Sequence, residues 1–314
     1  MSYCVLVPDD LNRESVELLK KQSFKVIAPG KMTRDETLSA IPDADALIIR
    51  SATKVDAELL QAATKLSAIV RAGVGIDNID LDAASEHSVV VMNTPDGNTI
   101  STAEYTFGLL LSLMRNIPAG HNSLSTRRWE RKLFMGAELH GKTLGIIGFG
   151  RIGRAVADRA WAFGMNVIAS DPFVDDDVAG MVELDELYAR SDIISLHCVA
   201  TEQTRGMICA ENIAKMKPGA YVINAARGAV INDDDLAAAI NSGHVSGAAL
   251  DVYDQEPPSP QNPLIGLDNV IHTPHLAAST VEAQIRVAMD AAQQIIDALT
   301  ANNFRNVVNS DAMK

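Results

Sequence analysis

The chain has 314 residues, with 40 acidic against 27 basic side chains and a formal net charge of −13. This excess of negative charge argues against broad binding to nucleic acid or anionic lipid, which requires a basic face. Apolar residues make up 47% and charged residues 21%, as in ordinary globular proteins, and the length predicts two domains.

Cysteine content and the N-terminal residues bear on the compartment. Cys4, Cys198 and Cys209 are too few for a disulfide framework, which favours a reducing compartment. The first ten residues have no basic region and turn acidic at once, so we expect no signal peptide. Since no apolar run approaches 18 residues, we expect no membrane span and a soluble, cytoplasmic protein.

Short runs rich in β-branched residues alternate with helical patterns along the chain. The first half offers strands at Val5–Val7, Lys25–Ala28, Ala46–Ile49, Ala68–Val70 and Val89–Met92, with amphipathic stretches at Asn12–Lys21 and Ala57–Ala63. The second half offers strands at Leu144–Ile147, Asn166–Ala169, Ile193–Leu196, Tyr221–Asn224, Ala248–Leu250 and Val270–His272. Near-continuous apolar strands separated by helices are typical of parallel sheets covered on both faces. The chain is therefore predicted to be an α/β protein with two doubly wound parallel-sheet domains.

Two long helical patterns are expected to join these domains. The segments Ser101–Glu104 and Ser279–Glu282 each fit a capping box, and each precedes apolar residues at helical spacing. The second helix follows the last strand and can return the chain to the first domain. We therefore predict a discontinuous domain of residues 1–96 and 284–314, and a second domain of residues 97–283.

The most specific motif is a glycine-rich loop between a strand and a helix. Gly148, Gly150 and Gly153 form a G-x-G-x-x-G pattern directly after the strand that ends at Ile147. In a dinucleotide site, such glycines permit a tight turn, backbone approach to the pyrophosphate and close helix packing. Asp171 ends the next strand, 171 − 150 = 21 residues beyond the middle glycine, and can bind ribose hydroxyls. Without a following arginine for a 2′-phosphate, the pattern favours NAD over NADP.

Three residues of the second half suit the reduction of a ketone or the reverse oxidation. Arg227 ends a strand, where its guanidinium can bind a carboxylate or polarise a carbonyl. His275 follows another strand, and Glu256 lies in a loop after a third strand of the same predicted sheet. A carboxylate bonded to the imidazole would favour its charged form and orient it for proton transfer. A solvated loop arginine and a structural histidine are the alternatives.

The first half offers a second group of anion-binding residues. Arg50 and Arg71 each end a strand, and Gly73 and Gly75 would leave backbone N–H groups available to a carboxylate. No metal site is expected, because His197-Cys198 and the pair His272 and His275 lack further ligands. A serine hydrolase is also unexpected, since no G-x-S-x-G pattern occurs.

These motifs together resemble the D-isomer-specific 2-hydroxyacid dehydrogenase family over essentially the whole chain. The resemblance is carried by the glycine loop and by the segments 71–78, 129–136, 224–228, 249–253 and 274–276, with Glu256-Pro257. It implies a Rossmann-like NAD domain and a flavodoxin-like substrate domain that open and close. The segment 134–136 and Arg50 favour the subgroup that oxidises 3-phospho-D-glycerate, the entry step of serine synthesis.

The resemblance implies roles for individual residues. Arg227, Glu256 and His275 would be catalytic, with His275 as the acid/base. The NAD site would be formed by Val74, Gly148, Gly150, Arg151, Ile152, Gly153, Asp171, Cys198, Ala225, Ala226, Asp251, Ala277 and Ala278. The substrate would be bound by Arg50, Ser51, Arg71, Gly73, Val74, Gly75 and, from the partner subunit, Arg131. Ala277 stands where many relatives have glycine, a change that we expect to be tolerated.

The resemblance also implies a homodimer through the NAD domains and leaves a tetramer open. Longer relatives carry C-terminal regulatory domains that bind serine; because this sequence ends at Lys314, we expect no such feedback. Two alternatives stay open: reduction of another 2-oxo acid such as glyoxylate or hydroxypyruvate, and an NAD(H)-sensing binding protein like the corepressors that share this fold.

Overall fold

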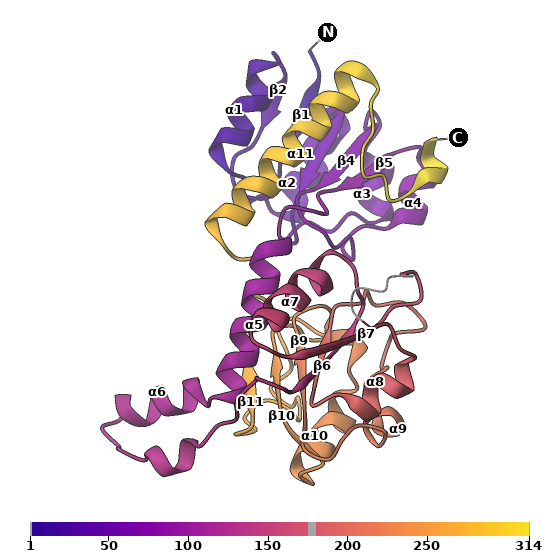
Figure 1. Cartoon of the computed structure of the whole chain (residues 1–314). Coiled ribbons are helices and arrows are strands. Elements are labelled where there is room, and N and C mark those ends of the chain that lie inside the picture. Colours follow the sequence, from indigo (N-terminus) through magenta and orange to yellow (C-terminus); the bar gives the residue numbers. More distant parts are fainter. Residues whose placement is uncertain (1, 175–179, 314) are drawn as a thin grey trace. The chain divides into compact units, whose positions relative to one another are not determined.

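The computed structural model describes residues 2–174 and 180–313 as two compact units (Figure 1). One unit comprises Met1–Asn98 with Ser279–Lys314, and the other comprises Thr99–Ala278. The sequence predicts boundaries at residues 96/97 and 283/284 instead. Within the described ranges, no helix is both long and apolar enough to cross a membrane.

The first unit contains a five-stranded parallel sheet in the order β2-β1-β3-β4-β5. Its strands are β1 (Cys4–Leu6), β2 (Lys25–Ile27), β3 (Ala46–Ile49), β4 (Ala68–Arg71) and β5 (Val90–Asn93). Its helices are α1 (Arg13–Lys21), α2 (Arg34–Ala40), η1 (Ile41–Asp43), α3 (Ala57–Ala62), α4 (Leu81–Glu86), α11 (Val281–Ala301) and η4 (Ser310–Met313). Helices α1 and α11 pack on one face of the sheet, while α3 and α4 pack on the other.

The second unit contains a six-stranded parallel sheet in the order β11-β10-β9-β8-β6-β7. Its strands are β6 (Thr143–Ile147), β7 (Asn166–Ser170), β8 (Ile193–Leu196), β9 (Ala220–Asn224), β10 (Val245–Leu250) and β11 (Val270–His272). Its helices are α5 (Thr99–Met114), α6 (Ile117–Ser125), η2 (Arg131–Phe134), α7 (Arg151–Ala162), α8 (Leu184–Arg190), α9 (Ala210–Ile213), η3 (Gly228–Val230) and α10 (Asp233–Asn241). Helices α5 and α7 cover one face, and α8, α9 and α10 cover the other.

In each sheet the strand order reverses at one point. In the first unit that point lies between β1 and β3, and in the second it lies between β6 and β8. Loops leaving two such strands turn to opposite faces of the sheet, which opens a crevice at their carboxyl ends. The loop carrying the G-x-G-x-x-G glycines and the loop carrying Arg50 therefore both leave a switch point.

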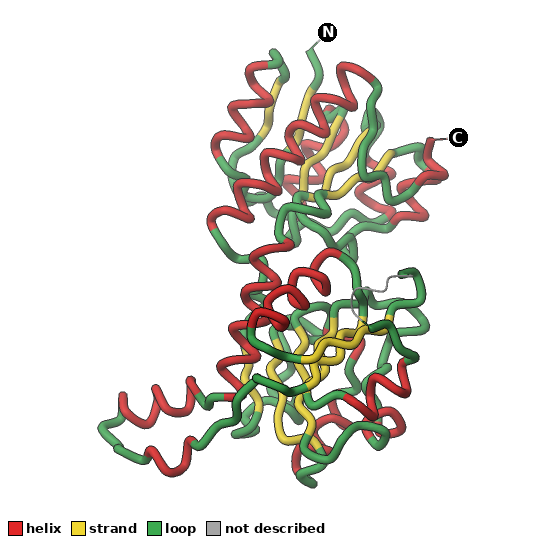
Figure 2. Tube along the Cα trace, viewed as in Figure 1, coloured by secondary structure: helices red, strands yellow, loops and turns green. Residues whose placement is uncertain are grey.

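Helices α6 and η2 form an arm that leaves the body of the second unit (Figure 2). Apolar side chains of this arm are largely exposed, including Trp129 at 77% and Met135 at 86%. Large apolar side chains gathered on one exposed segment mark an interaction surface more often than solvent-facing structure.

The prediction of two doubly wound parallel sheets is confirmed, and every predicted strand is present within three residues of its predicted ends. The two capping boxes are wrong. Helix α5 begins at Thr99, so Ser101 lies inside it, buried. Helix α11 is capped by Thr280, whose hydroxyl accepts from the N–H of Ala283, instead of by Ser279. Both predicted caps thus lie within two residues of the first residue of the helix, Thr99 in α5 and Val281 in α11.

Candidate active site

The glycine loop at the end of β6 is shaped by close backbone contacts. Gly148 has φ 91°, and a β-carbon there would lie 2.7 Å from the backbone nitrogen of Cys198. A β-carbon on Gly153 would lie 2.3 Å from the carbonyl oxygen of Gly148. Glycine at both positions therefore lets the turn form and brings α7 against the strand.

The start of α7 is open to an anion. Gly150 is the N-cap, so no side chain caps the first turn, and a β-carbon there would meet nothing within 4 Å. Arg151 and Ile152, the first two helical residues, are exposed and half-buried respectively. Uncapped N–H groups at a helix N-terminus are suited to bind a pyrophosphate. The loop therefore fits a dinucleotide such as NAD.

The carboxylate of Asp171 supports the glycine loop from the end of β7. It accepts hydrogen bonds from the N–H of Phe149, at 2.8 Å, and from that of Phe173, at 2.9 Å.

Across the switch point, Cys198 follows β8 with its thiol half-buried, and burial raises the pKa of that thiol to about 11. Cys198 is therefore a neutral thiol at neutral pH.

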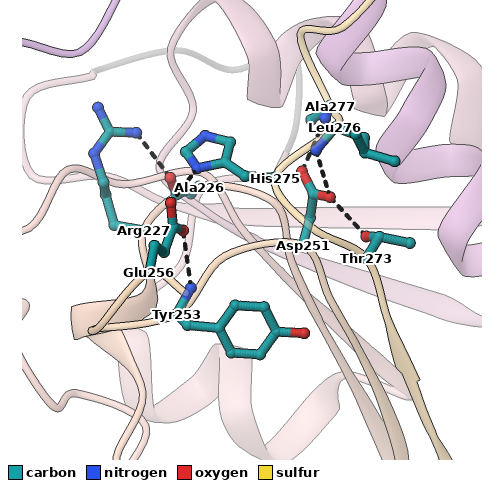
Figure 3. A network of polar contacts seen from close by, with 9 residues as sticks. All are labelled: Ala226, Arg227, Asp251, Tyr253, Glu256, Thr273, His275, Leu276 and Ala277. Atoms are coloured by element: carbon teal, nitrogen blue, oxygen red, sulfur yellow. Dashed lines mark hydrogen bonds and ion pairs between the residues drawn. The ribbon is translucent and has the colours of Figure 1, made fainter. Parts of the chain in front are cut away.

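Arg227 lies in a loop that packs tightly against the loop carrying Glu256. It follows β9 after Ala225 and Ala226, and its Nη1 donates to the carbonyl of Ala226 at 2.8 Å (Figure 3). The next residue, Gly228, has no room for a side chain, because a β-carbon would lie 1.9 Å from the carbonyl carbon of Tyr253. This contact brings the Arg227 loop against the loop that carries Glu256.

The structure pairs His275 with Glu256, a contact that spacing alone could not establish. Nδ1 of His275 lies 2.7 Å from Oε2 of Glu256, and Oε1 of Glu256 accepts from the N–H of Tyr253 at 3.2 Å. Figure 3 shows the imidazole above the carboxylate, with the guanidinium of Arg227 on the same side. Both ring and carboxylate are partly exposed, so a ligand can reach them.

The hydrogen bond between His275 and Glu256 shifts the pKa values of both residues. The hydrogen bond from Glu256 raises the pKa of His275, and this effect outweighs burial, which opposes it. Burial acts to raise the pKa of Glu256, but the hydrogen bond and charge of His275 outweigh it and lower that pKa. Each residue therefore favours the charged form of the other, and an imidazole held by an ionised carboxylate is suited to proton transfer.

Asp251 is the centre of the bonds that fix the His275 segment. Its fully buried carboxylate accepts from the hydroxyl of Thr273, at 2.6 Å, and from the N–H groups of Leu276 and Ala277, both at 2.8 Å. Its carbonyl accepts from the N–H of His275 at 2.8 Å. Ala278, which was also predicted to line the NAD site, follows Ala277 in the chain. Asp251 thus sets the backbone that carries His275.

In the first unit, Arg50 directly follows β3 at the switch point. Its Nη1 donates to the carbonyl of Asp10 at 3.2 Å, and Ser51 beside it is exposed. Arg71 ends β4, and its guanidinium folds over Gly73, where a β-carbon would lie 1.6 Å from Nη1. The adjacent strands β3 and β4 thus bring Arg50 and Arg71 to one edge of this sheet.

The remaining residues that were predicted to bind the substrate lie partly in the first unit and partly in the second. The carbonyl of Val74 accepts from the side-chain amide of Asn93 at 2.7 Å, and Gly75 follows in the same loop. Arg131 is exposed on η2, in the arm of the second unit, and among the described residues no hydrogen bond or ion pair links it to His275 or Glu256. Within its own unit, the structure therefore does not join Arg131 to the other site residues.

Sequence reasoning missed three residues that organise these loops: Asp9, Asn78 and Thr273. Asp9 and Asn78 hold the Arg50 loop, and Thr273 donates to Asp251. All three follow strands at the carboxyl edge of a sheet, a position that could have marked them. Over the described ranges, no cluster of three or more His, Cys, Asp or Glu is placed to hold a metal ion.

Two parallel sheets, an open glycine loop and a histidine–carboxylate pair define a nucleotide-dependent oxidoreductase. Residues 107–277 match the model of the D-isomer specific 2-hydroxyacid dehydrogenase NAD-binding domain, so the chain belongs to that family of NAD-binding dehydrogenases.

Among its relatives, D-3-phosphoglycerate dehydrogenase of Archaeoglobus fulgidus is 47% identical over 310 residues, 97% of this chain and 59% of that protein. The chain thus spans less than two thirds of that relative. The solved TT0316 protein of Thermus thermophilus has a TM-score of 0.91 at 34% identity, covering 97% of this chain and 99% of its own. A glyoxylate reductase from Paecilomyes thermophila has a TM-score of 0.91 at 30% identity, covering 98% of both chains.

Proposed function

We propose that the chain oxidises 3-phospho-D-glycerate at C2 to 3-phosphohydroxypyruvate with NAD. The observation that carries this proposal is the hydrogen-bonded pair of His275 and Glu256 beside Arg227 in the NAD-binding unit. A cation that can bind the carboxylate of a 2-hydroxy acid, next to a base for its hydroxyl, is what this chemistry requires.

Each residue of the pair has a separate task. Neutral His275 takes the hydroxyl proton of the substrate, and ionised Glu256 stabilises the imidazolium that results. Arg227 binds the carboxylate and fixes C2 for the transfer. The glycine loop and Asp171 would hold NAD, which supplies the acceptor for the hydride that leaves C2. In the reverse direction, His275 returns its proton to the carbonyl oxygen.

The phosphate end of the substrate is assigned to the arginines of the first unit. Arg50 and Arg71 lie at one edge of its sheet, and Arg131 of the partner subunit is proposed to complete the group. A protein of net charge −13 repels a small polyanion on average, so binding requires such local cations. The identity of 47% to a D-3-phosphoglycerate dehydrogenase supports the same substrate.

The second candidate keeps the chemistry and changes the substrate to glyoxylate or hydroxypyruvate. It is favoured by the fold shared with a glyoxylate reductase at 30% identity. The two candidates differ in whether the cations of the first unit act on a phosphate.

A comparison of substrates tests the proposal. NADH consumption is measured with phosphohydroxypyruvate, hydroxypyruvate and glyoxylate at matched concentrations, for the native chain and for Arg50→Ala and Arg71→Ala. We expect both variants to lose about 10- to 100-fold in kcat/KM for the phosphorylated substrate, the value of one or two charged hydrogen bonds. Lys65→Ala, which removes a cation before β4 at the opposite edge of the sheet, serves as the control. Equal rates with and without the phosphate would assign the second candidate instead.

The arm of α6 and η2 is proposed to dock on a second copy of this chain. Its exposed apolar residues, Trp129, Leu133 and Met135 among them, flank Arg131, so the same contact would bury apolar surface and deliver this arginine. Light scattering should show a dimer for the native chain and a monomer for Trp129→Asp. A monomeric native chain would overturn this assembly and the role of Arg131.

A further inference from the structure

Asp9 is a buried carboxylate whose bonding partners all come from the Arg50 loop. It is 6% exposed and follows β1 at the switch point of the first sheet. Its Oδ2 accepts from the N–H of Arg50 and, at 3.4 Å, from that of Thr53. Its Oδ1 accepts from the hydroxyl of Thr53 at 2.7 Å. The carboxylate therefore joins the two ends of a four-residue loop.

Asn78 holds the same two residues from the other side. Its side-chain amide donates to the carbonyl of Arg50, at 2.8 Å, and to that of Thr53, at 2.6 Å. Its own carbonyl accepts from the N–H of Val55 at 2.9 Å. Arg50 and Thr53 are thus bound at both their N–H and C=O groups, by side chains from two different loops.

We propose that Asp9 and Asn78 are positioning residues that set the affinity of the Arg50 loop for the anionic end of the substrate without touching it. This inference rests on the proposed function in taking Arg50 to bind that end. A loop with exposed residues such as Ser51 loses conformational freedom when it binds a ligand, and that cost weakens binding. Hydrogen bonds that fix the loop beforehand remove part of the cost.

The chemistry of Asp9 favours this role over simple packing. A buried carboxylate is unfavourable unless it is fully hydrogen-bonded, and here the loop supplies its donors. Any other loop conformation would leave the charge buried and unpaired. Asp9 therefore stabilises one loop conformation and penalises the alternatives, which an apolar side chain at the same place would not do.

Three variants distinguish a positioning role from simple packing: Asp9→Ala, Asp9→Asn and Asn78→Ala. We expect Asp9→Ala and Asn78→Ala to raise KM for the preferred 2-oxo acid about tenfold with kcat within about twofold, because His275 is untouched. Asp9→Asn should keep KM near the native value, since its amide oxygen can accept from both N–H groups and its NH₂ can donate to the hydroxyl of Thr53. Asp43→Ala removes the same charge before β3, at the opposite edge of the sheet, and should change nothing.

A second readout keeps the test independent of the substrate. Amide hydrogen exchange over residues 50–53 should accelerate in Asp9→Ala and in Asn78→Ala, but not in Asp9→Asn. If no 2-oxo acid is turned over, the proposed function fails, and the exchange rates then decide whether Asp9 and Asn78 fix the Arg50 loop. Unchanged exchange, a lower melting temperature with unchanged KM, or an Asp9→Asn variant as weak as Asp9→Ala would each overturn it.

Discussion

Asp251 holds His275 in a left-handed backbone conformation. His275 has φ 54°, a value uncommon for a residue with a β-carbon, and its N–H donates to the carbonyl of Asp251 at 2.8 Å. The two N–H groups that follow His275 donate to the carboxylate of the same aspartate. The turn thus depends on the Asp251 bonds, because the backbone alone would not favour it.

The bond from Thr273 to Asp251 should matter for turnover. Thr273→Val leaves the buried carboxylate with one donor fewer, which we expect to cost about 1–3 kcal/mol of stability and to lower kcat about tenfold. Thr273→Ser keeps the hydroxyl and should restore both values. Denaturant unfolding and steady-state kinetics measure the two effects. A Thr273→Ser variant as slow as Thr273→Val would contradict this account of the hydroxyl.

Replacing His275 by alanine should remove the proton carrier and leave the cofactor site intact. We expect kcat to fall about 10²- to 10⁴-fold, the usual contribution of a general acid or base. Affinity for NADH, measured by fluorescence titration, should stay within about threefold. His87→Gln is the matched control, since that exposed histidine lies at the end of α4, a helix that carries none of the proposed site residues. Undiminished turnover in His275→Ala would remove the residue from the mechanism.

The pH dependence should follow the His275–Glu256 pair. Reduction requires protonated His275, so its rate falls as pH rises through the pKa of that imidazole; oxidation requires the neutral form and falls as pH drops through it. Glu256 raises this pKa, so Glu256→Gln should move both limbs to lower pH. Profiles of kcat/KM in the two directions measure the shift, and limbs that stay in place would exclude Glu256 as the cause.

Gly228→Ala should separate the Arg227 loop from the Glu256 loop. Its β-carbon would lie 1.9 Å from the carbonyl carbon of Tyr253, so the backbone must move. We expect a loss of about 1–3 kcal/mol in stability from overpacking and a fall in kcat/KM of about 10²-fold or more from misplacement of the guanidinium. Gly108→Ala in α5, where a β-carbon meets nothing within 4 Å, is the control. Native kinetics in Gly228→Ala would show that this contact does not position Arg227.

Asp171→Ala should weaken binding of the cofactor and reduce the preference for NAD over NADP. The variant loses the carboxylate expected to meet the ribose hydroxyls and also the bond to the N–H of Phe149. We expect KM for NAD to rise about tenfold and the preference for NAD over NADP to narrow, because a negative charge no longer repels the 2′-phosphate. Kinetics with both cofactors measure this. An unchanged preference would place the discrimination on another residue.

The sequence by itself determined the strands and the residue types that carry the chemistry. A strand buried on both faces must be apolar along its whole length, and that is a local property, visible in runs such as Ala46–Ile49 and Ile193–Leu196. The glycine loop was equally readable, because each glycine answers a requirement of its own turn. Helix starts were less secure: the patterns at Ser101 and Ser279 lay within two residues of the helix starts, and in α11 the neighbouring Thr280 is the cap.

Tertiary structure alone decided which of these residues meet. His275 and Glu256 lie 19 positions apart in the chain, and their 2.7 Å contact depends on the order of strands in the sheet. The same holds for Asp9, which reaches 41 residues ahead to the Arg50 loop, and for the left-handed turn at His275. Side-chain bonds between loops arise only when the sheet has brought the loops to one edge, so no local pattern records them.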